Sequence, residues 1–312
     1  MQNNTPSQKK YYSPTQMAWR RFRHHSLAWY SLTFLLILSI VILIAPFILE
    51  KIFRFDYTIT NIYMRFLPIS LAHPFGTDDL GRDVLARILY GGRISLSVAL
   101  ISSLSSLLIG TAIGAWAGYY GGIIDSFLMR LTDAVLSLPT LPLMILLAAV
   151  DLQKALPESL SFLMHGNYAS MIKLMIIMIF FSWMGVARLV RGEFLSLRER
   201  EFVIAARGLG VSNKKIIWVH IIPNCVAPII VSITLSIGGI ILSEAALSFL
   251  GLGIQPPIPS WGNMLTNAQD YIRSSPLLAF FPGLFILLTV VAINFVGDGL
   301  RDAFDPQFVN KA

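Results

Sequence analysis

Charged residues are scarce in this chain. Only 13% of its 312 residues are Asp, Glu, Lys or Arg, whereas 55% are hydrophobic. A soluble domain has about 25% charged residues, because ionisable groups cover the surface that faces water. The composition therefore argues against a soluble globule and indicates one membrane domain.

Cysteine and the common enzyme motifs are also lacking. The single cysteine, Cys225, cannot form an internal disulfide, and we interpret it as a small packed residue. The sequence has no CxxC pair, no phosphate-binding GxxxxGK[ST] loop, and no GxSxG or HExxH motif. We therefore predict no metal, no cofactor and no enzymatic activity, so that any ATP hydrolysis would come from another chain.

The net charge of +7 could suggest nucleic-acid binding. The basic residues, however, occur in short stretches between apolar blocks rather than along one face. We therefore expect no nucleic-acid partner.

Six apolar blocks are long enough to cross a hydrocarbon layer of roughly 30 Å as helices. They cover residues 27–49, 94–117, 131–150, 168–190, 226–250 and 277–296. The predicted fold class is an all-α membrane protein with six transmembrane helices. The first block is too long for a signal-peptide core, so we predict an uncleaved helix.

The distribution of Lys and Arg predicts the orientation. If the N-terminus lies inside, the inner segments hold more basic residues than the outer ones, so both termini are predicted to be cytoplasmic. The predicted organisation is a cytoplasmic tail, a first transmembrane helix, an extracytoplasmic loop, a five-helix core with a cytoplasmic loop at 188–224, and a second cytoplasmic tail. These parts cover residues 1–26, 27–49, 50–93, 94–300 and 301–312.

The cytoplasmic loop of the core has the pattern of two short helices around a turn. Composition favours a helix over residues 196–207, which Gly208 and Gly210 would end. Ser212 would cap a second segment, and Pro223 would end it. A knob of this kind suits docking in a cleft of another protein.

The loop sequence EFVIAARGLGVSNKKIIWVHIIPN, at 201–224, resembles the EAA loop of permease subunits from ATP-binding-cassette (ABC) importers, in their peptide and nickel subfamily. Other segments resemble patterns of the same subfamily in the expected order. They are HPFGTDDLGRDVLARILYGGRISL at 73–96, ARLVRGEFLSLREREFV at 187–203, LSFLGLGIQPPIPSWGNML at 247–265 and NFVGDGLRDAFDP at 294–306.

The resemblance implies a type I (MetI-like) permease fold of the "C" type in the bacterial inner membrane. It also implies three kinds of partner: a second related permease, two ATPase subunits at the cytoplasmic face, and an extracytoplasmic solute-binding protein. The implied substrates are di- or oligopeptides, with nickel or another small solute as the alternative. By this resemblance the chain supplies half of a translocation pathway, and other subunits supply the energy.

The resemblance also assigns the loop to ATPase docking. It implies docking and turn roles for Ala205, Ala206, Gly210 and Pro223, and polar contacts for Glu201 and Arg207. Ser212 belongs to the same predicted surface. The chain departs from the family at Ile204, where many members have the glutamate of the EAA name, and Glu201 one turn earlier could replace it.

Two acidic residues lie in or near the predicted spans. Such groups normally face a bundle interior or a pathway, because a charge in hydrocarbon is costly. For Glu244, we leave open a structural partner, a place along the pathway, or simple protonation. Asp133 lies one turn from Arg130, so we expect it to pair with Arg130 or to be solvated.

Acidic and threonine side chains cluster in the predicted outer loop. Carboxylates at this spacing can hold hard cations, but Arg82 lies among them, and we expect a capped turn instead. The residues are Thr77, Asp78, Asp79, Arg82 and Asp83. Farther along, Trp261 follows a proline-rich stretch and could anchor at the membrane interface or face a binding protein.

The second span carries Gly110, Gly114 and Gly118 at a four-residue spacing, which allows close helix approach. We expect packing within the chain, with a subunit interface as the alternative.

Two other classes of protein fit less well. An ion-driven secondary transporter usually has inverted halves and broken helices, and it would not need a docking loop. An intramembrane enzyme would have only Glu244 and Asp133 as candidate acids.

Overall fold

A computed structural model describes residues 14–53, 57–151 and 166–304 of the chain. Over these residues the chain is helical, apart from turns and one isolated bridge between Thr77 and Asp83. Parts of the two predicted tails lie outside the described residues. The helices are α1 (Pro14–His24), α2 (Ser26–Phe53), η1 (Ile62–Met64), α3 (Val84–Tyr120), α4 (Gly122–Leu136), α5 (Thr140–Ala149), α8 (Ala169–Leu197), α9 (Glu201–Gly208), α10 (Asn213–Lys215), the π-helix η3 (Ile216–Ile221), α11 (Ile222–Phe249), α12 (Trp261–Ala268) and α13 (Leu277–Phe304).

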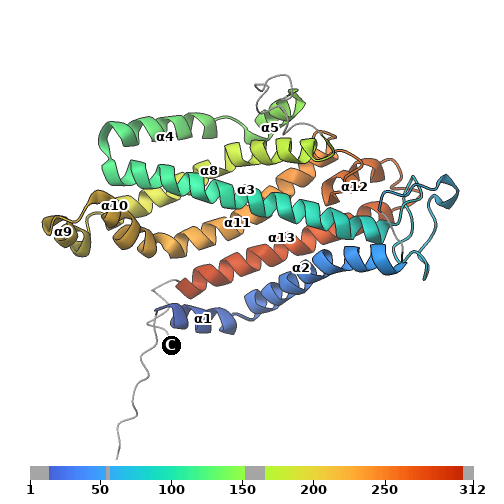
Figure 1. Cartoon of the computed structure of the whole chain (residues 1–312), viewed down its shortest axis with the longest axis horizontal. Helices are drawn as coiled ribbons and strands as arrows, with labels where there is room; N and C mark the ends of the chain where they lie inside the picture. Colours follow the sequence, from blue (N-terminus) through green and yellow to red (C-terminus); the bar gives the residue numbers. More distant parts are fainter. Residues whose placement is uncertain (1–13, 54–56, 152–165, 305–312) are drawn as a thin grey trace, which may run out of the picture.

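Five long helices, α2, α3, α8, α11 and α13, run along the long axis of an elongated bundle (Figure 1). Each is long and apolar enough to cross a membrane. Helices α9 and α10 project from one end, which we call the loop end, and α12 lies near the opposite end with the loop that precedes α3. Helix α1 and the last turns of α13 lie toward the loop end. The two ends of the described chain therefore share one side of the bundle.

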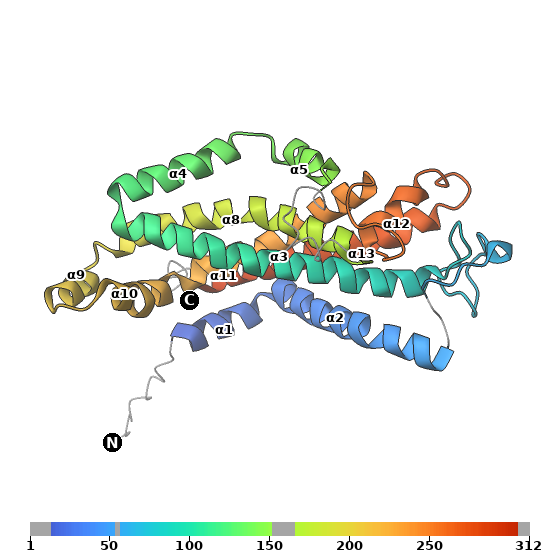
Figure 2. The ribbon, with the colours of Figure 1, turned by 45° about the horizontal axis from the view of Figure 1, so that its top comes forward.

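The predicted third span, 131–150, is not one straight helix. It is replaced by α4 and α5, which meet at an angle of 82°. Pro139 causes the break, because its ring disfavours helical geometry at Leu138 and it has no N–H to donate. Helix α3 ends near the loop end and α8 begins at the other, so the bent pair makes the return crossing (Figure 2). With the bent pair counted as one span, the described residues contain six candidate crossings.

Helix α3 begins ten residues before the predicted second span. The Asp83 carboxylate caps it by accepting a hydrogen bond of 2.8 Å from the amide of Ala86. Such a cap satisfies one of the N–H groups that have no partner at a helix start. Part of the predicted outer loop is therefore helix.

The glycines of α3 fit closely against α8. A Cβ atom at Gly110 would lie 2.6 Å from the carbonyl oxygen of Trp183, and one at Gly118 would lie 2.5 Å from Cβ of Phe194. A Cβ at Gly114 would clash with the carbonyl oxygen of Ala187. The predicted packing of these glycines within the chain is confirmed. It brings the backbones of α3 and α8 close together from Gly110 to Gly118.

An apolar core lies beneath α9 and α10. Phe194, Val203, Ile216 and Ile221 are fully buried in it, as is Cys225. Complete burial of each large aliphatic or aromatic side chain stabilises the fold by about 1.5–3 kcal/mol. The interpretation of Cys225 as a packed residue is confirmed, and the loop end has a folded foundation.

Candidate functional site

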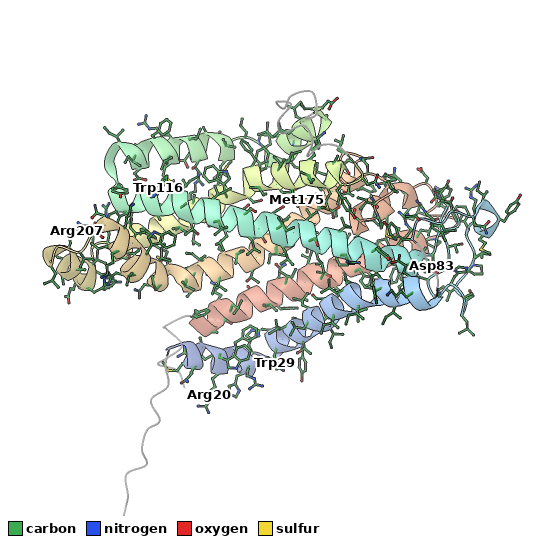
Figure 3. The ribbon with its side chains drawn as sticks, viewed as in Figure 1. Arg20, Trp29, Asp83, Trp116, Met175 and Arg207 are labelled. Carbon is green, nitrogen blue, oxygen red and sulfur yellow. The ribbon has the colours of Figure 1, made fainter. Side chains whose placement is uncertain are left out.

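Helices α9 and α10 form a folded projection between α8 and α11, and Arg207 lies on it in Figure 3. We call residues 198–215, from the end of α8 to the end of α10, the coupling loop. Helix α9 ends in a Schellman motif: the amide of Val211 donates to the carbonyl of Ala206 at 3.1 Å, and the amide of Gly210 donates to that of Arg207 at 3.0 Å. Gly210 has φ +75°, which glycine adopts without strain. The turn is thus set by Gly210.

Hydrogen bonds and a cation–π contact hold the coupling loop against α3. The Tyr119 hydroxyl donates to Oδ1 of Asn213 at 2.7 Å. The Arg207 guanidinium lies 5.6 Å from the centre of the Tyr119 ring. At the end of α8, Arg198 donates to the carbonyl of Gly118 at 3.1 Å. The coupling loop is therefore tied to the end of α3 as well as to its own flanking helices.

The predicted docking residues do not all face outward. Ala206 is buried, where it packs with Val211 and Val203 beneath the turn, so its side chain cannot reach a partner. The other predicted docking residues are exposed: Glu201, Ala205, Arg207, Gly210, Ser212 and Pro223.

Large apolar side chains on or beside the coupling loop are exposed, and the sequence pattern did not indicate a docking role for them. Leu209, at the tip, is 84% exposed, and Trp218 is 67% exposed. Ile204 and Phe202 are exposed on α9. An apolar residue directly between two turn glycines is the signal that could have identified Leu209, since tight turns normally carry polar residues.

Three details of the predicted loop are wrong. The helix expected over residues 196–207 begins only at Glu201, because α8 continues to Leu197. Ser212 occupies the N-cap position of α10, but its side chain makes no capping hydrogen bond. Pro223 does not end the second segment, because α10 continues through η3 into α11. Pro223 stands in the first turn of α11, where a missing N–H is tolerated. The π-helical hydrogen bonds of η3 span one more residue than α-helical ones and lead directly into this turn. The coupling loop and the fifth crossing are consequently one helical rod.

Glu244 lies in the half of α11 that is farther from the coupling loop, and it is fully buried. Its carboxylate accepts hydrogen bonds from the hydroxyls of Ser95 at 3.0 Å and Ser248 at 2.8 Å. The Ser95 oxygen also accepts from the amide of Trp261, and the Ser248 oxygen accepts from the amide of Ile254. Glu244 therefore joins α3, α11 and the start of α12 through partners within the chain.

Asp133 pairs with Arg188 of α8 and not with Arg130. The Arg188 Nε donates to the Asp133 carboxylate at 3.0 Å, and both side chains are about half exposed. A second pair joins Arg191 of α8 to Asp125 of α4 through two hydrogen bonds. Both ion pairs link α4 to α8, which the sequence could not show because the partners lie 55 and 66 residues apart.

The acidic cluster before α3 forms the predicted capped turn. Asp78 accepts from the Arg82 side chain at 2.7 Å, while Asp83 caps α3 and contacts Nδ1 of His73 at 2.9 Å. Both roles expected for Trp261, an interfacial anchor or a surface facing a binding protein, are wrong. The side chain is fully buried, and its indole N–H donates to the carbonyl of Ile88 at 3.0 Å. Trp261 therefore fastens α12 to α3.

Comparison with known proteins identifies the family. The sequence profile described as binding-protein-dependent transport system inner membrane component matches residues 110–310. The chain belongs to this family of permeases. A second profile, the N-terminal transmembrane domain of oligopeptide transport permease C, matches residues 13–68 of the permease. The predicted resemblance and fold class are confirmed, and the permease is a multi-pass protein of the bacterial inner membrane.

Curated relatives cover almost the entire permease. A dipeptide transport system permease protein, DppC, of Alkalihalophilus pseudofirmus is 40% identical over 98% of this chain and 94% of its own length. The oligopeptide permease OppC of Bacillus subtilis is 37% identical over 96% and 92%, and OppC of Haemophilus influenzae is 40% identical over 94% and 88%.

A solved structure supports the same fold. The inward-facing MetNI methionine ABC transporter contains a chain that matches with a TM-score of 0.50 and 15% identity, over 71% of the permease and 97% of that chain. At this identity the match shows the fold alone.

Proposed function

We propose that this permease forms, with a second related permease, the inner-membrane pathway of an importer for di- or oligopeptides. Its similarity to dipeptide and oligopeptide permeases over nearly the whole chain supports this substrate class. Separate ATPase subunits hydrolyse ATP, and an extracytoplasmic binding protein delivers the peptide. The loop end faces the cytoplasm, because Lys214, Lys215 and the arginines of α8, α9 and α1 gather there.

The coupling loop is the proposed docking surface for an ATPase subunit. The observation that carries this proposal is the 84% exposed Leu209 at the tip of a turn that backbone and side-chain hydrogen bonds hold in one shape. An exposed apolar anchor on a rigid support is typical of a residue that inserts in a partner's pocket. Glu201 and Arg207 flank it as polar contacts.

The geometry also suggests how docking moves the membrane helices. Tyr119 and Arg198 join the coupling loop to the end of α3, and η3 continues it into α11. A displacement of the docked loop would carry α3 and α11 with it. In this proposal Glu244 is a structural residue that keeps α3, α11 and α12 together at the outer end during that motion.

The test is replacement of Leu209 by glutamate in the assembled transporter. We expect Leu209→Glu to weaken retention of the ATPase subunits and to reduce solute-stimulated ATP hydrolysis, because a carboxylate would have to be desolvated in an apolar pocket. Co-purification and ATP turnover in reconstituted complexes measure both effects.

The control is Leu71→Glu, the same change at a fully exposed leucine of the outer loop. ATPase retention should not change in this variant. If Leu209→Glu retained the ATPase subunits and coupled ATP hydrolysis as the unaltered protein does, the docking proposal would be wrong.

A further inference from the structure

Helix α1 is not a continuation of the first membrane helix. The chain breaks at His25, whose Nδ1 accepts a hydrogen bond of 3.2 Å from the amide of Ala28, and α1 leaves α2 at a wide angle (Figure 2). The inner face of α1 is apolar: Ala18 and Phe22 are buried against Ala303 at the end of α13. The helix is thus held against the bundle where α2 begins.

The other sides of α1 are basic and aromatic. Arg20 and Arg23 are exposed there, and Trp19 is 51% exposed. The sequence of α1, PTQMAWRRFRH, has no acidic residue. Figure 3 shows Arg20 and Trp29 along this part of the molecule. Helices that lie in the headgroup layer of a membrane carry arginines on one face and tryptophan or phenylalanine on the other, and α1 combines both kinds of residue.

Arg23 has a distinctive environment. Its guanidinium lies 4.9 Å from the Trp29 ring centre and 5.8 Å from that of Trp19, and the two rings meet edge to face at 6.0 Å. Within the described part of the chain, no ion pair joins Arg23 to a carboxylate. Aromatic contacts use the faces of a guanidinium and leave its N–H edge for bidentate contact with a phosphate.

A small apolar cavity of about 130 Å³ adjoins this cluster. It is lined by Ala18, Trp19, Phe22, Leu300, Ala303 and Phe304. One acidic residue faces the junction of α1 and α2: Asp302 lies 3.7 Å from Nε2 of His25, and it contacts that ring rather than Arg23. The site therefore combines the N–H edge of Arg23, the tryptophan side chains beside it, and the apolar cavity, which we call the notch.

We propose that α1, together with the end of α13, binds an anionic phospholipid. The phosphate contacts Arg23, with Arg20 adding positive charge, and the upper part of one acyl chain occupies the notch beside Trp19. Anionic lipid fits better than a protein partner on charge and position: the cluster stands where α2 enters the hydrocarbon, the depth at which tryptophan and headgroups meet. This inference does not depend on ATPase docking.

The test compares lipids retained by the full chain. The chain would be reconstituted in nanodiscs of phosphatidylcholine and phosphatidylglycerol, extracted, and its bound lipids counted by native mass spectrometry. We expect preferential retention of phosphatidylglycerol, and a fall in that preference of about fivefold in Arg23→Gln, the effect of one basic residue near an anionic surface. Arg23→Lys keeps the charge but not the planar stack, and its preference should be intermediate.

The matched control is Arg200→Gln, which removes the same charge from an exposed arginine of the coupling loop. Its lipid preference should equal that of the unaltered chain. The proposal is wrong if Arg23→Gln keeps the full preference, or if Arg200→Gln loses as much. A lysine variant equal to the unaltered chain would overturn the stacked-guanidinium geometry.

Two further arms exclude other occupants. Excess inorganic phosphate should not displace the lipid, and displacement would reassign the site to a free anion. A photoreactive residue at position 19, in the assembled transporter, should capture lipid; capture of a protein subunit would overturn the lipid assignment.

Discussion

The close approach of α3 and α8 gives a quantitative prediction about a single methyl group. Gly114→Ala would add a Cβ atom that clashes with the carbonyl oxygen of Ala187. The same Cβ would lie 2.9 Å from Cβ of Val190 and 3.1 Å from the amide nitrogen of Arg191. Two of these three atoms belong to the backbone of α8. They cannot yield by a rotamer change, so the helices must separate.

Gly185 provides a matched comparison on α8. A Cβ at Gly185 would meet nothing within 4 Å. Both glycines lie inside long helices, so both substitutions by alanine gain the same helix propensity, about 0.5–1 kcal/mol. That gain cancels between the two variants. The difference between their free energies of unfolding isolates the packing cost, which for an overpacked core is about 1–3 kcal/mol.

Cys225 provides a site-specific probe of unfolding. It is the chain's single cysteine and is fully buried in the folded protein. A thiol-reactive fluorophore therefore reports unfolding at one known position during titration with sodium dodecyl sulfate. We expect Gly114→Ala to unfold at lower detergent fractions than Gly185→Ala. Equal stability of the two variants would refute the close α3–α8 packing.

Three other predictions concern polar contacts and the turn. Glu244→Leu leaves the hydroxyls of Ser95 and Ser248 without their acceptor and should lower the free energy of unfolding, measured with the Cys225 probe, by about 1–3 kcal/mol. Glu244→Gln keeps an acceptor oxygen and should lower it less. The reverse order would contradict the hydrogen bonds around Glu244. Gly210→Ala forces alanine to φ +75°, at a cost of about 1–2 kcal/mol, and should speed hydrogen exchange of the Val211 amide, so unchanged exchange would count against the Schellman turn. Tyr119→Phe removes the bond to Asn213 and should speed exchange across the coupling loop, whereas Tyr120→Phe should not; similar exchange in both variants would disprove the tether.

The sequence was sufficient for the helical membrane fold, because apolar blocks of membrane length have few alternatives. It also located the turn at Gly210, since a left-handed residue after a helix is usually glycine. The bend near Pro139 was harder to predict. A proline indicates a possible break, but the direction of the chain after it depends on α8, whose Arg188 and Arg191 hold α4 from distant positions.

Side-chain environments were the least predictable part of the site. Ala206 fitted the expected smooth docking tip, yet it faces inward, because the Schellman turn folds Val211 back over it. Trp261 follows prolines, a pattern that suggested an exposed anchor, but its indole lies in the core beside Ile88. Pro223 looked like a terminator, but it begins a helical turn. In each case the outcome depended on which distant helix packed against the residue.

The unbroken helical path from Asn213 to Phe249 has a mechanical consequence. At 1.5 Å per residue, its 37 residues form a beam of about 55 Å, so each degree of tilt shifts one end by about 1 Å relative to the other. The helix would work as a lever: a force applied at its Asn213 end, outside the hydrocarbon, would move the Glu244 cluster near its other end. The π-helical turns of η3 lie close to the Asn213 end of this helix. A local change of direction there would adjust the fit of the coupling loop without changing the distance through which the far end moves.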